Sequence, residues 1–245
     1  MDEIRKIPPV TRFLCGSSLG VTLPVLLKLV SPYRIFFVRQ LVTQKFEIWR
    51  LYTSFFFGGS GLQYLFEFVM LYRNSDQLEA SVTYVGRSAD YAWQLFWAAC
   101  AILGMNLPLH SFLHARALLV CLTYLSARLA PPGTQTSLWG LLTIPVVYFP
   151  YALIAMDFIM AGPAAAATSV TGAVVGHLWW WGVHDTRAMR SYSVAPAWLS
   201  NWIDGPRRPE GATSSGGVHV VPPRRREEPG VAMGHTWGSG QRLGN

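Results

Sequence analysis

Six apolar stretches, each close to the length of a membrane-spanning helix, dominate this chain of 245 residues. They cover approximately Arg12–Leu29, Phe55–Leu71, Tyr91–Leu107, Phe112–Leu129, Leu138–Met160 and Ala164–Val183. The hydrocarbon core of a bilayer is roughly 30 Å thick, so a helix needs about 20 predominantly apolar residues to cross it. Inside lipid every backbone polar group needs a partner, which makes the helix the expected state. The pattern therefore predicts an all-α integral membrane protein with six transmembrane helices.

The composition supports a membrane protein over a soluble one. Hydrophobic residues make up 51% of the chain and charged residues only 13%, whereas soluble domains carry about a quarter charged residues. A soluble helical bundle would need apolar stripes with polar opposite faces, but the stretch Leu138–Ala155 is apolar on all sides. The soluble alternative is therefore disfavoured.

The formal net charge of +7 is better explained by a lipid bilayer than by nucleic acid. Much of it comes from arginines in the last quarter of the chain, namely Arg187, Arg190, Arg207, Arg208, Arg224, Arg225, Arg226 and Arg242. Basic residues beside transmembrane segments set orientation and contact anionic headgroups. We therefore expect the bilayer as a partner and no nucleic acid.

The distribution of basic residues predicts that both termini are cytosolic. An even number of spans places the termini on one side, and both ends of the chain are basic, as is the second loop with Arg73 and Arg87. The first loop conflicts with this orientation because it carries Arg34, Arg39, Lys45 and Arg50. A loop that folds into the interface and pairs its own charges, for example Glu47 with Lys45, removes the conflict.

No pattern in the sequence predicts a metal or another cofactor. The three cysteines, Cys15, Cys100 and Cys121, lie in apolar stretches without CxxC spacing, so packed thiols are expected. His110 and His114 are four residues apart, as metal ligands on a helix are, but no third ligand lies near them in the sequence.

The chain changes character after about Asp185, where Gly, Pro, Ser and Arg dominate. Such a composition buries too little apolar surface to fold by itself. We therefore predict a membrane domain over residues 1–184 and a disordered, flexible cytosolic tail over residues 185–245. Near its end, Trp237 and Leu243 are two apolar anchors separated by glycines, which suits a short peptide that docks on a partner.

The first loop contains Trp49 and Arg50, a pair with two interpretations. Trp suits the membrane interface, and Arg donates up to five hydrogen bonds to backbone carbonyls or phosphates. The pair would then hold an irregular loop in one leaflet. An interfacial Trp beside a flanking cation is also common in membrane proteins of many kinds.

The sixth apolar stretch contains Gly172, Gly176 and His177. Glycines four residues apart share a helical face and allow a neighbouring helix to approach closely, which indicates packing. His177 is an ionisable residue in an apolar setting, where such residues are functional candidates. A neutral histidine hydrogen-bonded to a neighbouring helix is the interpretation we favour.

A catalytic serine is not apparent. A membrane serine protease needs a nucleophile within hydrogen-bond reach of its histidine, together with oxyanion donors. Ser126 is the candidate in the fourth span, but Tyr124 and Ala127 stand where a Gly-x-Ser-Gly motif has glycines. The sequence therefore predicts no catalytic residues, with an active protease using Ser126 and His177 as the alternative.

These motifs together resemble the Derlins, rhomboid-like proteins of the endoplasmic reticulum membrane. The resemblance rests on Ile7–Arg12, Ser31-Pro32, Phe46–Arg50, Leu71-Tyr72, Ser75–Glu79, Gly86–Tyr91 and the segment Gly172–His177. Within Ser75–Glu79, the residues Ser75, Leu78 and Glu79 form the family motif of the second loop. Residues 236–244 resemble the SHP box of a Derlin subgroup through Trp237, Gly238, Gly240, Arg242 and Leu243.

The resemblance implies a six-span, rhomboid-like pseudoprotease of endoplasmic-reticulum-associated degradation. Such a protein retrotranslocates misfolded proteins to the cytosol by thinning the bilayer locally, and its tail recruits a hexameric AAA ATPase. It also implies a ubiquitin-ligase complex as a partner, and a homo- or hetero-oligomer stays open. A channel or transporter is a further alternative, disfavoured because the spans carry few charges, namely Lys28, Glu67, Arg116 and Asp157.

Overall fold

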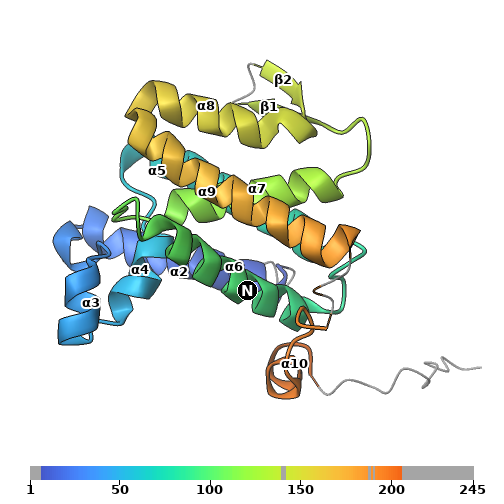
Figure 1. Ribbon diagram of the computed structural model, residues 1–245, viewed down its shortest axis with the longest axis horizontal. Coiled ribbons are helices and arrows are strands. Elements are labelled where there is room, and N and C mark those ends of the chain that lie inside the picture. Colours follow the sequence, from blue (N-terminus) through green and yellow to red (C-terminus); the bar gives the residue numbers. More distant parts are fainter. Residues whose placement is uncertain (1–6, 139–141, 187–188, 190, 206–245) are drawn as a thin grey trace, which may run out of the picture. The chain divides into compact units, whose positions relative to one another are not determined.

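The computed structural model describes residues 7–138, 142–186, 189 and 191–205. The helices are α2 (Pro9–Leu26), α3 (Arg39–Lys45), α4 (Trp49–Phe56), α5 (Gly61–Glu79), α6 (Ser88–Asn106), α7 (Ala115–Leu129), α8 (Phe149–Ala161), α9 (Pro163–Trp179) and α10 (Ala197–Ile203). Short 3₁₀ turns cover Pro32–Arg34 and Val146–Tyr148, and a π-helical turn, Trp180–Asp185, extends α9. The described part of the chain is therefore mainly helical (Figure 1).

Helix α7 lies at the centre of the bundle. It packs against α9, α5 and α8, while α9 also contacts α6 and α8, and α2 contacts α4, α5 and α6 (Figure 1). Buried side chains from five of these helices form one core, among them Leu14, Leu78, Tyr91, Leu122 and Val175. A central helix that is buried along almost its whole length has neighbours on every side.

Prolines and a glycine set the boundaries of the first and last long helices. Helix α2 starts at Pro9, and α9 starts at Pro163, the helix position where proline needs no N–H partner. Gly162, which separates α8 from α9, has a φ of 85°, a left-handed conformation that glycine adopts without steric cost. The sharp turn at Gly162 makes α8 and α9 antiparallel neighbours.

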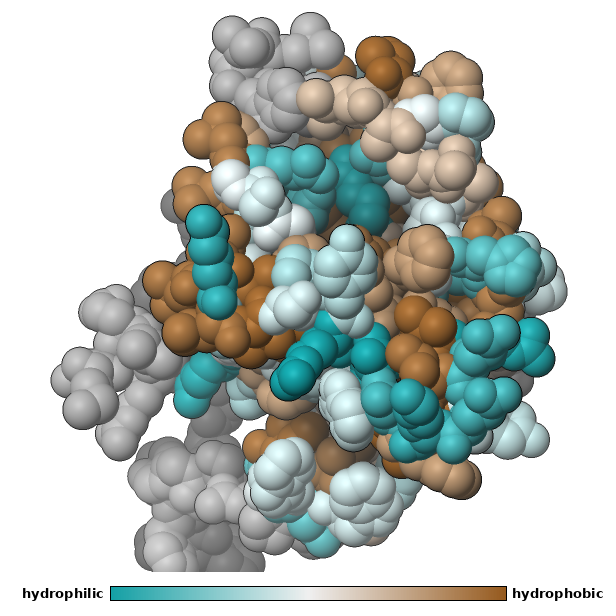
Figure 2. Space-filling model, turned by 90° about the vertical axis from the view of Figure 1, so that its left-hand side faces the viewer, coloured by the Kyte–Doolittle hydropathy of each residue, from teal (hydrophilic) through white to brown (hydrophobic). Residues whose placement is uncertain are grey.

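The hydrogen bonds at the helix ends define two ends of the bundle. At the end that we call the terminal end, Val10 of α2 meets Glu79 of α5, and Ala89 of α6 meets Asp204. At the opposite end, which we call the first-loop end, His114 before α7 bonds to Ser54 of α4. Figure 2 views the side on which Figure 1 shows α3 and α4, and hydrophilic residues are interspersed with hydrophobic ones on that face.

Two of the predicted spans differ from the observed elements. The predicted span Phe55–Leu71 is divided, because α4 ends at Phe56 and α5 begins only at Gly61. The predicted span Leu138–Met160 is wrong in its first third, where an antiparallel hairpin pairs β1 (Gln135–Leu138) with β2 (Leu142–Pro145) in the register Gln135 opposite Pro145. Pro145, which disfavours helix at the residue before it, ends the hairpin, and α8 begins afterwards.

The described chain also extends beyond the predicted boundary at residue 184. Residues 191–205 include α10, bond to α6 and belong to the same compact unit as the helices before them. Composition alone suggested a flexible segment because Gly, Pro, Ser and Arg dominate the chain after about Asp185. The carbonyls of Tyr192 and Ser193 accept hydrogen bonds from the side chains of Trp93 and Gln94, 99 residues earlier in the sequence, and no local pattern reveals such contacts.

Several of the helices are short for membrane spans. Among the described helices, α2 alone is both long enough and apolar enough to pass a membrane-span test by length and composition, and Val146–Ala161 is a shorter apolar helical segment. Helix α7 has 15 residues and α8 has 13. At 1.5 Å per residue these lengths correspond to about 22 Å and about 20 Å.

Candidate functional site

Arg50 holds the first loop in place. It lies on α4 with only 7% of its surface exposed. Its Nη1 donates to the carbonyl oxygens of Tyr33 at 2.7 Å and Phe36 at 2.9 Å, and its Nε bonds to Glu47. The guanidinium thus satisfies backbone carbonyls, as the sequence suggested, and the acid that neutralises it is Glu47. Glu47 thus pairs with Arg50, three residues later in the sequence, and not with Lys45 as expected.

Neighbouring contacts connect the same loop to the start of α7. Thr53 donates to the carbonyl of Ile35 at 3.0 Å, and Phe37 N–H donates to the carbonyl of Phe112 at 2.9 Å. His114 N–H donates to the carbonyl of Ser54 at 2.9 Å. Trp49, in contrast, is 56% exposed, so it lies on the surface where an interfacial Trp belongs. Arg50 therefore holds the interior of the loop through hydrogen bonds, whereas Trp49 is part of the loop surface.

Replacing Arg50 with lysine is expected to loosen this loop. Lysine keeps the charge but lacks the planar fork that reaches two carbonyls at once, and a buried acceptor without its donor costs about 1–3 kcal/mol. Hydrogen–deuterium exchange should rise in residues 32–38 of Arg50→Lys, while the matched variant Arg39→Lys, at an exposed position, leaves exchange unchanged. Equal exchange in both variants would contradict this role of Arg50.

Ser75, Leu78 and Glu79 lie in the last turns of α5 and not in the loop after it. The Glu79 carboxylate accepts hydrogen bonds from the backbone N–H groups of Val10 (3.1 Å) and Thr11 (2.8 Å), and from the Thr11 hydroxyl. Ser75 bonds to the Thr11 hydroxyl at 2.9 Å and Leu78 is buried in the core. Helix α2 has no N-cap side chain of its own, so a carboxylate from α5 satisfies its first N–H groups and complements its dipole.

Gly172 and Gly176 bring α9 into backbone contact with α7. A Cβ atom on Gly172 would lie 2.1 Å from the carbonyl oxygen of Ala117, and one on Gly176 would lie 3.0 Å from that of Cys121. The first distance is shorter than any Cβ atom tolerates and the second is tighter than most Cβ contacts, so this helix spacing requires glycine at position 172 and favours it at position 176. The geometry is that of two helices packed through small residues.

His177 takes part in a polar and aromatic cluster on the surface. Tyr124 OH bonds to His177 Nδ1 at 2.8 Å and accepts from Arg128 Nε and Nη2 at 3.0 and 2.9 Å. Because both N–H groups of arginine donate, the tyrosine proton remains available for His177 Nδ1. The Arg128 guanidinium also lies over the rings of Tyr124 and Trp180. This cluster joins the ends of α7 and α9.

Ser126 faces away from His177. Its Oγ donates to the carbonyl of Thr123 at 3.0 Å and, more weakly, to Asn74 Oδ1 at 3.4 Å. Ser126 and Tyr124 are two residues apart on α7 and therefore point to opposite sides of the helix. The two members of the alternative catalytic pair are thus not brought together.

Three charged residues form an ion cluster at the first-loop end. The sequence showed these residues individually but did not predict that they lie together. Arg116 of α7 bonds to Asp157 of α8 at 2.7 Å and lies 3.4 Å from Glu67 of α5. Asp157 also accepts from Ser169 of α9, and Glu67 accepts from Gln63 at 3.0 Å. One guanidinium therefore connects three helices, and a serine adds the fourth. The available sequence signal was the presence of one base and two acids in otherwise apolar stretches.

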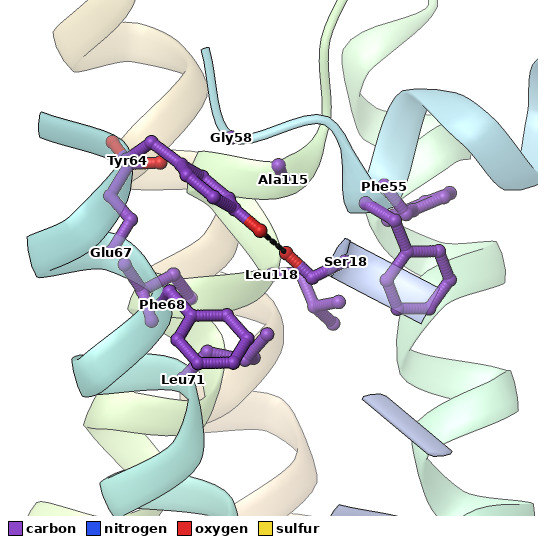
Figure 3. A pocket seen from close by; sticks show the side chains of 11 residues that line it. Ser18, Phe55, Gly58, Tyr64, Glu67, Phe68, Leu71, Ala115 and Leu118 are labelled. Atoms are coloured by element: carbon purple, nitrogen blue, oxygen red, sulfur yellow. Dashed lines mark hydrogen bonds between the residues drawn. The ribbon is translucent and has the colours of Figure 1, made fainter. Parts of the chain in front are cut away.

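A small cavity lies beside Glu67. Its volume is about 20 Å³, which is room for a water molecule. Figure 3 shows Tyr64, Glu67, Phe68 and Leu71 of α5 lining it opposite Ser18, with Ser18 and Tyr64 joined by a 3.4 Å hydrogen bond. The polar groups of this cavity come from α2 and α5.

A second polar cluster lies at the terminal end. Gln94 Oε1 accepts from Tyr84 OH and Trp179 Nε1, both at 2.7 Å, and His184 Nε2 lies 3.1 Å from Tyr84 OH. Burial raises the pKa of Tyr84 and lowers the pKa of His184, because each is removed from water that would stabilise its charged form. Both residues are therefore neutral near pH 7, which suits hydrogen bonding.

The tail motif lies outside the described residues. Trp237, Gly238, Gly240, Arg242 and Leu243 belong to the range 206–245, of which the structure describes nothing. Within the described residues, no group of three or more His, Cys, Asp or Glu side chains could hold a metal ion.

The described part of the chain is mainly helical, and comparison with known proteins gives its family. A model of the Der1-like family matches residues 7–190. Derlin-1 of Arabidopsis thaliana is 30% identical over 203 positions, covering 80% of this chain and 74% of the relative. Derlin-1 of Mus musculus is 28% identical over 254 positions, covering 100% and 98%, and a probable derlin-2 homolog of Dictyostelium discoideum is 28% identical, covering 85% and 84%.

The chain therefore belongs to the Der1-like family. As a Derlin it is a protein of the endoplasmic reticulum membrane with a role in endoplasmic-reticulum-associated degradation. The resemblance drawn from the sequence motifs is confirmed at this level.

Proposed function

We propose that the protein is a catalytically inactive, rhomboid-like retrotranslocation factor. Its membrane body thins the bilayer and admits misfolded proteins, and its tail recruits the AAA ATPase that extracts them. An endoplasmic reticulum ubiquitin-ligase complex completes the set of partners. The observation that carries this proposal is the shortness of α7 and α8 in a member of the Der1-like family.

The alternation of helix directions supports six spans with both termini on one side. Helices α2 and α5 meet through the start of one and the end of the other, and α7 and α9 run parallel, since Gly172 lies at Ala117 and Gly176 at Cys121. Helix α8 connects them in the opposite direction. These directions suit a chain that crosses the membrane with α2, α5, α6, α7, α8 and α9 in turn and has cytosolic termini.

Hydrophobic mismatch supports the thinning. A helix of about 20 Å in a core of roughly 30 Å leaves about 10 Å uncovered. A bilayer accommodates such a mismatch by becoming thinner, at a cost of fractions of a kcal/mol per Å of mismatch. Because α7 is the central helix and α8 packs on it, the mismatch concentrates around α8. A thinner bilayer lowers the barrier that a polar client segment meets there.

The hydrogen bonds of two serines support the absence of hydrolysis. In a serine–histidine pair the serine proton goes to the histidine. Here Ser126 donates to the carbonyl of Thr123, and Ser54, although 3.2 Å from His114 Nδ1, donates to the carbonyl of Leu51. Ser54 and His114 are also completely buried, so a scissile bond has no access to them.

Degradation of a misfolded client tests the proposal. In cells that lack the protein, Ser126→Ala is expected to restore client clearance to the wild-type rate, because the hydroxyl serves only packing and local bonding. The double variant Trp237→Ala, Leu243→Ala should fail to restore it and should also lose the AAA ATPase from pull-downs with a peptide of residues 229–245. Loss of clearance in correctly folded Ser126→Ala would overturn the pseudoprotease assignment.

A further inference from the structure

The segment after α9 is bound tightly to the start of α6. Ala195 N–H donates to Asp90 Oδ1 at 2.7 Å, and Gln94 Nε2 donates to the carbonyl of Ser193 at 3.0 Å. Ala89 N–H donates to the Asp204 carboxylate at 3.2 Å, which joins the end of α10 to the first turn of α6. Helix α10 is thus held at two points, before its first residue and after its last.

These contacts place α10 at the depth of one end of α6. The bonded residues of α6 lie within the segment Ser88–Gln94, which extends about 9 Å along the helix axis. The headgroup layer on each side of the hydrocarbon core is roughly 5–8 Å thick. If α6 spans the membrane, α10 therefore lies at the height of this layer (Figure 1).

Helix α10 turns its polar residue inwards and its largest apolar residues outwards. Ser200 is buried, while Trp198 is 66% exposed and Trp202 is 80% exposed. The two tryptophans are four residues apart and share one face. A soluble surface helix has the reverse arrangement, and tryptophan, with its apolar ring and N–H donor, prefers the membrane–water interface.

The surroundings favour phospholipid as the group that covers this face. Basic residues flank α10 in the sequence at Arg187, Arg190, Arg207 and Arg208. Such residues attract anionic headgroups. On α6, Phe96 and Trp97 are about half exposed, one turn beyond the docked segment. Exposed aromatic side chains are thus present both on α10 and on the part of α6 that follows its contacts with this segment.

We propose that Trp198 and Trp202 insert into the headgroup layer of the protein's own membrane and make α10 an interfacial anchor. The anchor fixes the point at which the chain leaves the bilayer, so the tail begins at the membrane surface. The proposal rests on α6 spanning the membrane, and the assignment to the cytosolic leaflet rests on the orientation of the spans, both given under Proposed function.

The test uses the full chain, labelled with fluorotryptophan and reconstituted in nanodiscs of phosphatidylcholine and phosphatidylserine. The variants Trp198→Phe and Trp202→Phe assign the two fluorine NMR signals by their disappearance. Lipid carrying a nitroxide near the headgroup should remove most intensity from both signals, and a water-soluble relaxation agent should affect them less. Trp97 serves as the deeper lipid-exposed control and the buried Trp179 as the protected one.

Two results would overturn the proposal. Signals broadened by the soluble agent and unaffected by the lipid nitroxide would place the tryptophans in water. Signals protected from both agents would indicate a protein partner or a second copy on this face. Neither result depends on the ATPase, because peptide binding by residues 229–245 is measured separately.

Discussion

Replacing Gly172 with alanine is expected to destabilise the membrane body more than alanine at the other helical glycines of the described residues. The new Cβ would lie 2.1 Å from the carbonyl oxygen of Ala117 and 2.9 Å from its Cα. These are backbone atoms, which cannot rotate away as a side chain does, so α9 must move from α7. Overpacking typically costs about 1–3 kcal/mol, and a clash with backbone belongs at or above the upper end of that range.

The measurement is the unfolding free energy of the purified protein in mixed micelles, with two matched glycines for comparison. Gly176→Ala is expected to cost less, because its Cβ would lie 3.0 Å from Cys121 and Tyr124. Gly104→Ala on α6 has open space within 4 Å, and alanine there should stabilise the helix by up to about 1 kcal/mol. The order of the three variants is the prediction, and equal effects at Gly172 and Gly104 would contradict it.

The sequence predicts helices well where one hydrophobic segment has clear stops. Helix α6 (Ser88–Asn106) corresponds closely to the predicted span Tyr91–Leu107, and α9 corresponds to Ala164–Val183. The sequence predicts helix boundaries less well where apolar residues continue across the boundary between two elements. The glycines before α5 and the proline that ends β2 are visible in the sequence, but apolar residues on both sides conceal the division into two elements.

The contacts between distant polar residues could not be predicted from any local pattern. Arg116 and Asp157 are 41 residues apart, and Ala195 bonds to Asp90 across 105 residues. Each pair consists of polar groups that are costly to bury without a partner. A polar residue in an apolar stretch therefore indicates that it has a partner, but the sequence does not show which residue that partner is. Glu79 is likewise recognisable as a motif residue in the sequence. Its role as the cap of α2 appears only in the structure, because the residues that it binds lie in a distant part of the sequence.

Both ends of the bundle are therefore held by polar groups, and its middle by packing. At the terminal end carboxylates of Glu79 and Asp204 cap α2 and α6. At the first-loop end Arg50 fixes a loop and Arg116 connects helices. The central helix α7 takes part in these contacts through Arg116, which bonds to Asp157 of α8. We expect the second large change in stability from a substitution in the ion cluster of Arg116, Glu67 and Asp157.

Replacing Arg116 with methionine is expected to leave two acids without their shared cation. The side chains of Arg116, Glu67 and Asp157 are 21%, 12% and 13% exposed. Removing one partner of a buried ion pair costs about 3–5 kcal/mol, because the remaining charge is neither hydrated nor paired. We therefore expect Arg116→Met to lower the unfolding free energy by an amount in this range and to reduce accumulation in the membrane.

A triple variant separates the loss of the ion pair from the loss of packing. Arg116→Met combined with Glu67→Gln and Asp157→Asn removes all three charges at similar volume, and replacing a whole buried ion cluster by neutral groups is often nearly neutral. Most of the lost stability should therefore return in the triple variant. If the triple variant is as unstable as Arg116→Met alone, the arginine side chain stabilises the fold through its packing against α5 and α8 and not through its charge.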